Sequence, residues 1–471
     1  MEITTKPHAA ILSSPGMGHI IPVIQLGKRL VDYHGFHVTI FIVASNESSD
    51  QSQLLQLHAY KNSLEMVEFP AIDIANLVEP NANVVTRLVV VMREAVPALR
   101  SAISAMKCPP SVLIVDLFGT EALCLAEEFK ISKYVYVATN ARFLSFSLHV
   151  PTLHELIKGE FADQKEPLKI PGCKPVRLED VVGSILDRSS QQYYEYLRIC
   201  KQLRLGDGIL LNTWQDLEAQ ALASIQNVQV YPIGPLVRPV KPDGLKGEML
   251  CWLDKQSTES VLYVSFGSGG TMSVKQITEL AFGLEQSQQR FIWVLRKPVE
   301  NNADASFFSA GKEHDDDPPS KYLPDGFLTR TKESGFIVPN WAPQIDILSH
   351  RSVGGFMTHC GWNSVMESIV NGVPMIAWPL YAEQMMNATL LTEELGVAVR
   401  SEVLPTKAVV GRVEIEKMVR MIMEDKQGKG IRERVRELQC GARKALSEGG
   451  SSSNALSQLA KYCSTYTSYG K

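Results

Sequence analysis

Short apolar runs alternate with longer amphipathic stretches along this 471-residue chain. In the first half, compact runs rich in β-branched residues lie at 8–13, 38–43, 112–115, 134–137 and 208–212. Between them, apolar residues recur at helical spacing from residue 20 to Gly35, over 84–106 and over 191–205. Repeated switching between a two-residue and a 3.6-residue period predicts βαβ units and a parallel sheet.

A second series of the same kind follows in the other half of the chain. Its predicted strands lie at 261–265, 291–295, 336–339, 353–358 and 375–378, and the tail at 411–466 is predicted to be helical. Proline and glycine cluster at 231–235 and again at 237–247, between the two series. We therefore predict an α/β chain of two doubly wound parallel-sheet domains, 1–236 and 248–453, joined by a linker at 237–247.

Charge and cysteine usage exclude several classes of protein. The chain has 47 Lys and Arg against 51 Asp and Glu, which leaves no basic surplus for nucleic acid or an anionic membrane. No apolar run approaches the ~20 residues of a membrane span, and the run at 8–13 is too short for a signal-peptide core. The eight cysteines show no zinc-type spacing, so we expect reduced thiols in a cytoplasmic protein.

A polar insertion between Lys297 and Lys321 carries the acidic run Asp315, Asp316 and Asp317. Such a run is compatible with a metal site or with a solvated loop. The surrounding pattern supplies no further ligands, so we expect the loop and no metal.

The first strand is followed by the letters SPGMGH at 14–19 and then by a helical pattern. His19 is therefore predicted at a helix N-terminus beyond a strand's carboxyl end, where open α/β sheets bind ligands. A neutral imidazole there can remove a proton from a hydroxyl, and the positive helix end favours the neutral form. Asp116, which ends another strand, is the natural carboxylate to orient that imidazole. The structural alternative is that His19 closes a turn and Asp116 caps the helix after Phe118.

The stretch 353–370 reads as a strand, a tight turn and a helix. The helix is predicted over 364–370, with Asn363 or Ser364 as its cap. Free N–H groups at such a start suit a phosphate, and His359 beside it is interpreted as a phosphate donor rather than a satisfied turn residue. Glu367 lies one turn in and would repel a phosphate, so a pair of ribose hydroxyls suits it better.

Both ends of the stretch 341–384 also carry residues suited to binding. Trp341 suits stacking on a flat base whose edge Ala342 and Gln344 read, although a core tryptophan is the usual alternative. At the other end, Glu383 and Gln384 set an acid beside an amide, which suits the hydroxyls of a sugar.

A glycine-rich loop at 265–270 follows a predicted strand and precedes a helix that Ser273 and Gln276 start as a capping box. Its backbone allows close approach of a diphosphate, and Ser268 offers a hydroxyl. A simple tight turn is the alternative. The third glycine of a dinucleotide fingerprint is replaced by Met272 here and by Ile21 in the N-terminal loop, which argues against NAD or FAD.

Together these motifs resemble the plant family 1 UDP-glycosyltransferases. WAPQ opens a forty-four-residue box that contains HCGWNS, a glutamate three residues after its serine, and a closing acid followed by glutamine. The similarity covers almost the whole chain and includes PGMGH, VDLFG and YVSFGSGG. With WPLYAEQMMNA, these motifs look closest to the branch that glucosylates small phenols such as hydroquinone, monolignols and chlorophenols.

The resemblance implies a GT-B fold, in which two Rossmann-like domains face a cleft and a last helix, at 454–471, returns to the first domain. It implies inverting transfer of glucose from the co-substrate UDP-glucose to the hydroxyl of a small phenolic or polyphenolic acceptor, giving a β-O-glucoside without a metal or other cofactor. A flavonoid or monolignol as main acceptor, and a non-catalytic UDP-sugar-binding protein, are the alternatives. We expect a monomer.

Residue roles follow from the same resemblance. His19 is the base and Asp116 its support, and Gln384 goes with glucose rather than galactose. The expected donor-binding residues are Thr139, Ser268, Trp341, Ala342, Gln344, His359, Trp362, Asn363, Ser364, Glu367, Glu383 and Gln384. The expected acceptor-binding residues are Pro15, Gly16, Phe118, Phe143, Leu144, Phe146, His149, Leu178 and Ala382. Glu383 stands where many relatives have Asp, which leaves the exact sugar contacts open.

Overall fold

The computed structural model describes residues 6–44, 63–79, 82–240, 247–300 and 318–465. The acidic run at 315–317 lies outside these residues. The chain divides into an N-terminal unit, Met1–Val237 with Lys444–Lys471, and a C-terminal unit, Arg238–Arg443.

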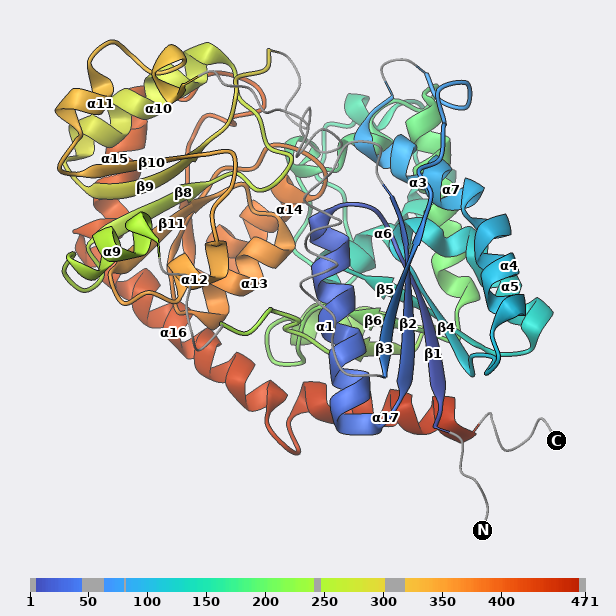
Figure 1. Cartoon of the computed structure of the whole chain (residues 1–471). Helices are drawn as coiled ribbons and strands as arrows, with labels where there is room; N and C mark the ends of the chain where they lie inside the picture. The colour runs from blue at the N-terminus through green and yellow to red at the C-terminus, as the bar shows by residue number, and fades with distance from the viewer. Residues whose placement is uncertain (1–5, 45–62, 80–81, 241–246, 301–317, 466–471) are drawn as a thin grey trace. The chain divides into compact units, whose positions relative to one another are not determined.

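The N-terminal unit is built on one parallel sheet of seven strands in the order β3-β2-β1-β4-β5-β6-β7 (Figure 1). The strands are β1 (His8–Ser13), β2 (His37–Val43), β3 (Leu64–Phe69), β4 (Val112–Asp116), β5 (Ser132–Val137), β6 (Gly208–Leu211) and β7 (Val230–Pro232). β1 and β4 are neighbours, so the loops that follow them leave from the same edge of the sheet. This pairing brings residues 14–19 close to Asp116.

Helices cover this sheet in the βαβ manner that the periodicity predicted. They are α1 (Met17–His34), α3 (Val84–Glu94), α4 (Val96–Ala105), α5 (Leu123–Phe129), α6 (Ala141–Leu156), α7 (Gln191–Gln202), α8 (Ala219–Ser224) and α17 (Ser451–Thr465). Short 3₁₀ turns lie at Leu117–Ala122, Phe161–Asp163, Leu178–Asp180, Gly183–Ile185 and Leu203–Leu205.

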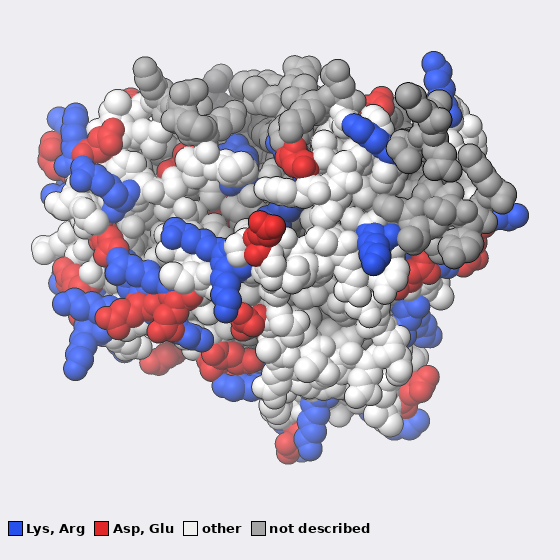
Figure 2. All heavy atoms as spheres, turned by 90° about the horizontal axis from the view of Figure 1, so that it is seen from below, with Lys and Arg blue, Asp and Glu red and all other residues white. Residues whose placement is uncertain are grey.

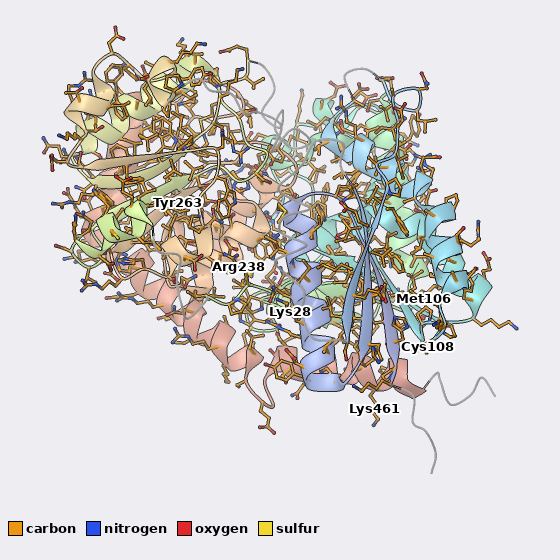
Figure 3. All side chains as sticks on the ribbon, in the orientation of Figure 1. Lys28, Met106, Cys108, Arg238, Tyr263 and Lys461 are labelled. Atoms are coloured by element: carbon orange, nitrogen blue, oxygen red, sulfur yellow. The ribbon has the colours of Figure 1, made fainter. Side chains whose placement is uncertain are left out.

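The end of the chain is part of the first core. Leu456, Leu459 and Cys463 of α17 are buried in one cluster with α1 residues such as Ile24 and strand residues such as Ile114. In Figure 3, Lys28 on α1 and Lys461 on α17 mark these two neighbouring helices. The N-terminal unit is therefore completed by residues from the far end of the sequence.

The C-terminal unit has a parallel sheet of six strands in the order β10-β9-β8-β11-β12-β13. The strands are β8 (Val261–Ser265), β9 (Arg290–Leu295), β10 (Gly335–Pro339), β11 (Val353–Thr358), β12 (Met375–Ala377) and β13 (Ala398–Arg400). β8 and β11 are paired, so the loop after β8 and the turn after β11 lie at one sheet edge. Tyr263 of β8, labelled in Figure 3, stacks on Phe356 of β11 inside the sheet layer.

The helices of this unit are α9 (Glu248–Asp254), α10 (Val274–Ser287), α11 (Phe327–Arg330), α12 (Gln344–Leu348), α13 (Trp362–Val370), α14 (Gln384–Thr389), α15 (Arg412–Met423) and α16 (Lys426–Leu446). A 3₁₀ turn lies at Pro319–Lys321 and a π-helical turn at Leu390–Glu394. α10 and α15 pack on each other around a core that includes Leu280, Ile415 and Trp293.

The predicted bounds of two helices were wrong. The stretch 84–106 forms two helices that meet at Ala95, because Pro97 sits in the first turn of α4 and cannot continue the hydrogen-bond ladder of α3. The helix predicted at 364–370 begins two residues earlier, and its N-cap is Gly361 without a side-chain cap. Asn363 and Ser364 therefore lie inside its first turn.

The capping box predicted at α10 forms by half. Ser273 accepts a hydrogen bond from the backbone N–H of Gln276 at 3.2 Å, as expected. The Gln276 side chain, however, exchanges hydrogen bonds with the backbone of Val410. A tertiary partner has replaced the local one.

Acidic and basic side chains are interspersed over the face of the molecule in Figure 2, in keeping with their near balance in the sequence. Within the described ranges, no helix has the length and apolar content needed to cross a bilayer.

Candidate active site

The N-terminal unit joins His19 and Asp116 in direct contact. His19 Nδ1 lies 2.9 Å from Asp116 Oδ2, and the His19 side chain is 17% exposed while that of Asp116 is fully buried. His19 sits in the first turn of α1 and Asp116 at the end of β4. With Nδ1–H donated to the carboxylate, Nε2 of His19 is the nitrogen without a proton and can act as the basic atom.

The other oxygen of Asp116 has its own donors. Ser14 Oγ donates to Asp116 Oδ1 at 2.5 Å, and the backbone N–H of Phe118 donates to the same oxygen at 3.3 Å. Asp116 therefore caps the turn at Leu117–Ala122 and also contacts His19, so both interpretations of this residue hold at once. Ser14 was not among the predicted site residues, although it stands directly before the PGMGH motif.

The predicted acceptor residues divide by burial. Phe118 is half-buried and its ring meets the His19 ring edge-on at 5.4 Å between centroids. His149 and Leu178 are also half-buried, and Pro15 and Gly16 precede the first turn of α1. Phe143, Leu144 and Phe146 on α6 are buried, which favours core packing for the last two. Ala382 belongs to the C-terminal unit and has a positive φ of 53°.

The start of α6 depends on a residue that the sequence analysis missed. Glu218 is buried and its carboxylate accepts hydrogen bonds from the backbone N–H groups of Ala141 and Arg142. The hydroxyl of Thr213 donates to it at 2.7 Å. Burial raises the pKa of Glu218, while these three donors oppose that rise. No local pattern announces this contact, because 77 residues separate Glu218 from Ala141.

The C-terminal unit presents the start of α13 next to a buried histidine. His359 is almost fully buried, and burial followed by the positive charge of Arg296 lowers its pKa to about 4. Its Nδ1 has no hydrogen-bond partner among the described residues. The imidazole is therefore neutral at pH 7 and keeps hydrogen-bonding capacity beside the N-terminus of α13.

Two glycines make room for this imidazole. A Cβ atom on Gly267 would lie 2.5 Å from His359 Nε2, and one on Gly361 would lie 2.4 Å from the same atom. The glycine after β8 and the glycine before α13 therefore both pack against the His359 ring. A side chain at either position would displace the ring.

Gln344 links two of the predicted donor-site residues. Its Nε2 donates to Ser364 Oγ at 2.9 Å and to Glu367 Oε2 at 2.7 Å. Burial raises the pKa of Glu367, and the bond from Gln344 and the charge of Arg238 act in the opposite direction. Arg238, labelled in Figure 3, also pairs with Asp346 at 3.4 Å. Ser364 and Glu367 share one face of α13, as their spacing predicted.

The other residues predicted to bind the uridine diphosphate differ in exposure. Trp341 is 56% exposed, so it is not a core tryptophan, and its ring is available for stacking. Ala342 beside it is buried, while Ser268 in the loop after β8 and Asn363 in α13 are half-buried.

The predicted sugar residues are mostly buried. The Gln384 side chain accepts hydrogen bonds from the backbone N–H groups of Leu380 and Tyr381, both at 3.0 Å. Its amide carbonyl is thereby fixed by the loop before α14. Trp362 is 2% exposed, Glu383 is half-buried, and Thr139 in the N-terminal unit is buried next to the start of α6.

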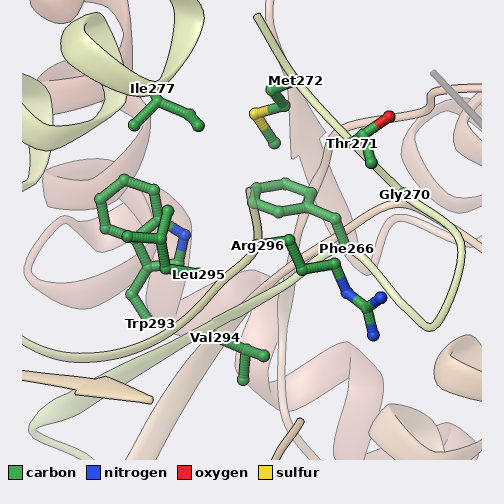
Figure 4. Close-up of a pocket in the computed structure, with 9 residues that line it drawn as sticks. All are labelled: Phe266, Gly270, Thr271, Met272, Ile277, Trp293, Val294, Leu295 and Arg296. Atoms are coloured by element: carbon green, nitrogen blue, oxygen red, sulfur yellow. The ribbon is translucent and has the colours of Figure 1, made fainter. Parts of the chain in front are cut away.

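Behind the loop that follows β8 lies a small cavity lined by Phe266, Gly270, Thr271, Met272, Ile277, Trp293, Val294, Leu295 and Arg296 (Figure 4). Most of these side chains are apolar. The lining suits packing beneath the loop and does not suit a charged diphosphate. Among the described residues, no group of three or more His, Cys, Asp and Glu is placed to hold a metal ion.

Comparison with known proteins returned consistent matches. The family profile "UDP-glucoronosyl and UDP-glucosyl transferase" matches residues 226–431. The chain is 54% identical to anthocyanidin 3-O-glucosyltransferase 5 of Manihot esculenta, over 97% of this chain and 96% of that protein. It is 44% identical to the hydroquinone glucosyltransferase of Rauvolfia serpentina, over 96% of this chain and 97% of that protein. The crystal structure of TcCGT1 in complex with UDP matches with a TM-score of 0.92 at 49% identity, covering 98% of this chain and all of that one.

Proposed function

Because the chain belongs to the plant family 1 UDP-glycosyltransferases, we propose that it transfers glucose from UDP-glucose to a hydroxyl of a small phenolic or polyphenolic acceptor. The product is a β-O-glucoside, formed with inversion at the anomeric carbon.

The contact between His19 and Asp116 carries this proposal. His19 Nε2 removes the proton of the acceptor hydroxyl as that oxygen forms a bond to the anomeric carbon, and the bond from this carbon to the UDP oxygen breaks. The proton ends on His19, where the Asp116 carboxylate at 2.9 Å stabilises the imidazolium. UDP leaves with the electron pair of the broken bond.

UDP is assigned to the C-terminal unit, and a relative of known structure was crystallised with UDP. Trp341 stacks on the uracil beside Ala342, and Glu367 with Gln344 binds the ribose hydroxyls. The diphosphate takes the N-terminus of α13 and the residues His359, Asn363, Ser364 and Ser268. Neutral His359 contributes a hydrogen bond, and the leaving group is stabilised without a metal.

Gln384, Glu383 and Trp362 are assigned to bind the glucosyl hydroxyls, with a contribution from Thr139. The fixed carbonyl of Gln384 supports this assignment, because a side chain locked by two backbone donors presents its amide N–H groups in one direction. The longer side chain of Glu383 reaches further than the Asp that is common at this position.

The acceptor is assigned as an aromatic alcohol. A phenol needs apolar walls near the base, and Phe118 supplies one at 5.4 Å from His19. The names of two relatives specify an anthocyanidin and hydroquinone, so both polyphenols and simple phenols belong in a test.

The eight cysteines are free thiols, which supports the predicted cytoplasmic location, and the monomeric state stays a prediction.

The test is acceptor-dependent release of UDP from UDP-glucose with hydroquinone, coniferyl alcohol and quercetin, followed by mass analysis. We expect a gain of one hexose on at least one of the three. UDP binding without any acceptor-dependent release would contradict the proposed transfer and favour a sugar-nucleotide-binding protein.

A further inference from the structure

The carboxylate that supports the base is fixed through both of its oxygens. Asp116 Oδ2 contacts His19 at 2.9 Å, and Oδ1 accepts from Ser14 at 2.5 Å and from the Phe118 N–H at 3.3 Å. Ser14 and Asp116 are both fully buried. Because water does not reach this pair, the Ser14 hydroxyl is the side-chain donor that satisfies the second oxygen.

Ser14 comes from the loop that also places His19. It directly follows β1, and β1 pairs with β4, whose last residue is Asp116. The same short segment therefore delivers the base and a donor to the carboxylate from two directions. A carboxylate bonded through one oxygen can rotate about its Cβ–Cγ bond, whereas donors on both oxygens fix its plane.

The orientation and the basicity of the Asp116 carboxylate both matter because a titratable histidine lies against it. Titratable groups around it in the described part of the chain include His19 on α1 and Tyr136, its register partner on β5. Burial, followed by the charge of Asp116, keeps the Tyr136 hydroxyl protonated by raising its pKa, and the positive charge of Arg29 opposes that rise. The proton taken from the acceptor therefore stays on His19 Nε2, and Asp116 acts on it through the hydrogen bond to Nδ1.

We propose that Ser14 is a positioning residue for the base. Its hydroxyl fixes the plane of the Asp116 carboxylate and takes up part of its negative charge, so that Oδ2 faces His19 Nδ1 and Nε2 stays unprotonated. The proposal rests on the glucosyl transfer proposed above. In this role Ser14 acts through its hydrogen bond to Asp116.

The test compares Ser14→Ala with Ser13→Ala. Ser13 is the neighbouring residue and is equally buried, but its hydroxyl donates to the backbone carbonyl of Ser14 at 3.2 Å and not to the carboxylate. For each variant, the acceptor kcat/KM is measured across pH, together with the Kd for UDP and the melting temperature.

For Ser14→Ala we expect kcat to fall about ten-fold, since a hydrogen bond to a charged group is lost, with the Kd for UDP within two-fold of wild type. A less stabilised carboxylate attracts the imidazolium more strongly and raises the pKa of His19. The acidic limb of the kcat/KM profile should therefore move up by about half a pH unit. Ser13→Ala should keep the wild-type profile.

A Ser14→Ala profile that coincides with that of Ser13→Ala would overturn the positioning role while leaving the proposed transfer intact. A lower kcat with an unmoved acidic limb would overturn it as well, because general loosening of the loop lowers the rate without changing the His19 pKa. No transfer by the wild-type protein would overturn both proposals.

Discussion

At the residue scale, two histidines at similar places in the two units have different chemistry. His19 and His359 each follow a strand and precede or enter a helix, yet only His19 has a carboxylate partner. His359 is buried between Gly267 and Gly361, and its pKa is lowered to about 4. The first arrangement suits a base, and the second suits a neutral hydrogen-bond donor to an anion.

The packing of glycine on His359 gives a first prediction. Gly361→Ala places a methyl group 2.4 Å from Nε2, so the imidazole must leave its position beside α13. We expect the Kd for UDP, measured by calorimetry, to rise about ten-fold. Gly411→Ala is the control, because a Cβ there meets no atom within 4 Å. Equal UDP affinity in the two variants would show that the ring position does not matter for binding.

The lowered pKa of His359 predicts a pH dependence of stability. Its folded pKa of about 4 lies below the ordinary 6.5, so the unfolded chain takes up the proton first as pH falls. Stability is therefore lost between pH 6.5 and 4, and this histidine accounts for about 2 kcal/mol of loss between pH 7 and 5. The free energy of unfolding is measured in urea at both pH values. Between pH 7 and 5 it should fall by about 2 kcal/mol less for His359→Asn than for wild type. Parallel pH curves for the two proteins would contradict the shift.

At the element scale, the last helix contributes to a core whose other members lie at the start of the sequence. Leu459 of α17 is buried in the cluster that contains Ile24 and Ile114. Leu459→Ala should reduce the free energy of unfolding of the N-terminal unit by about 3 kcal/mol. The Kd for UDP should stay unchanged, because the predicted uridine residues lie in the other unit.

Gln458→Ala is the matched control, since Gln458 is the exposed neighbour of Leu459 on the same helix. Thermal unfolding followed by circular dichroism separates the two variants. If Leu459→Ala has the same melting temperature as the control, α17 contributes little to the stability of the N-terminal unit.

Element positions were largely predictable, and element ends were not. Apolar periodicity found strands such as β1 and β11 because their residues are buried along their whole length. It missed β3, where Glu65 and Glu68 interrupt the apolar residues at the sheet edge, and the three-residue strands β7 and β13. The start of α13 was misplaced because polar residues that resemble caps lie inside the first turn.

The candidate site was predictable where strand ends place it. His19 and Asp116 were paired in advance because one follows β1 and the other ends the neighbouring strand β4, at the same sheet edge. Ser14 and Glu218 were not found, since neither residue type by itself indicates a base or its partner, and their contacts at 2.5 Å and 3.0 Å are made only by tertiary packing. Such contacts depend on tertiary packing and leave no local pattern.

At the scale of the whole molecule, the predicted GT-B fold is confirmed by the two parallel-sheet units and by the match to solved structures. The proposed roles divide between the units: the proposed base and its carboxylate belong to the N-terminal unit, and the predicted UDP residues belong to the C-terminal unit. A change in either set should therefore affect either the acceptor chemistry or UDP binding, and not both.

Transfer by His19→Ala tests this account most directly. Product formation from UDP-glucose and the best acceptor is followed by mass analysis, the anomeric configuration by NMR, and UDP binding by calorimetry. We expect wild type to give a β-glucoside and His19→Ala to lose about 10²- to 10⁴-fold in kcat, with its Kd for UDP within two-fold of wild type. An unchanged rate in His19→Ala, or an α-glucoside from wild type, would contradict the account.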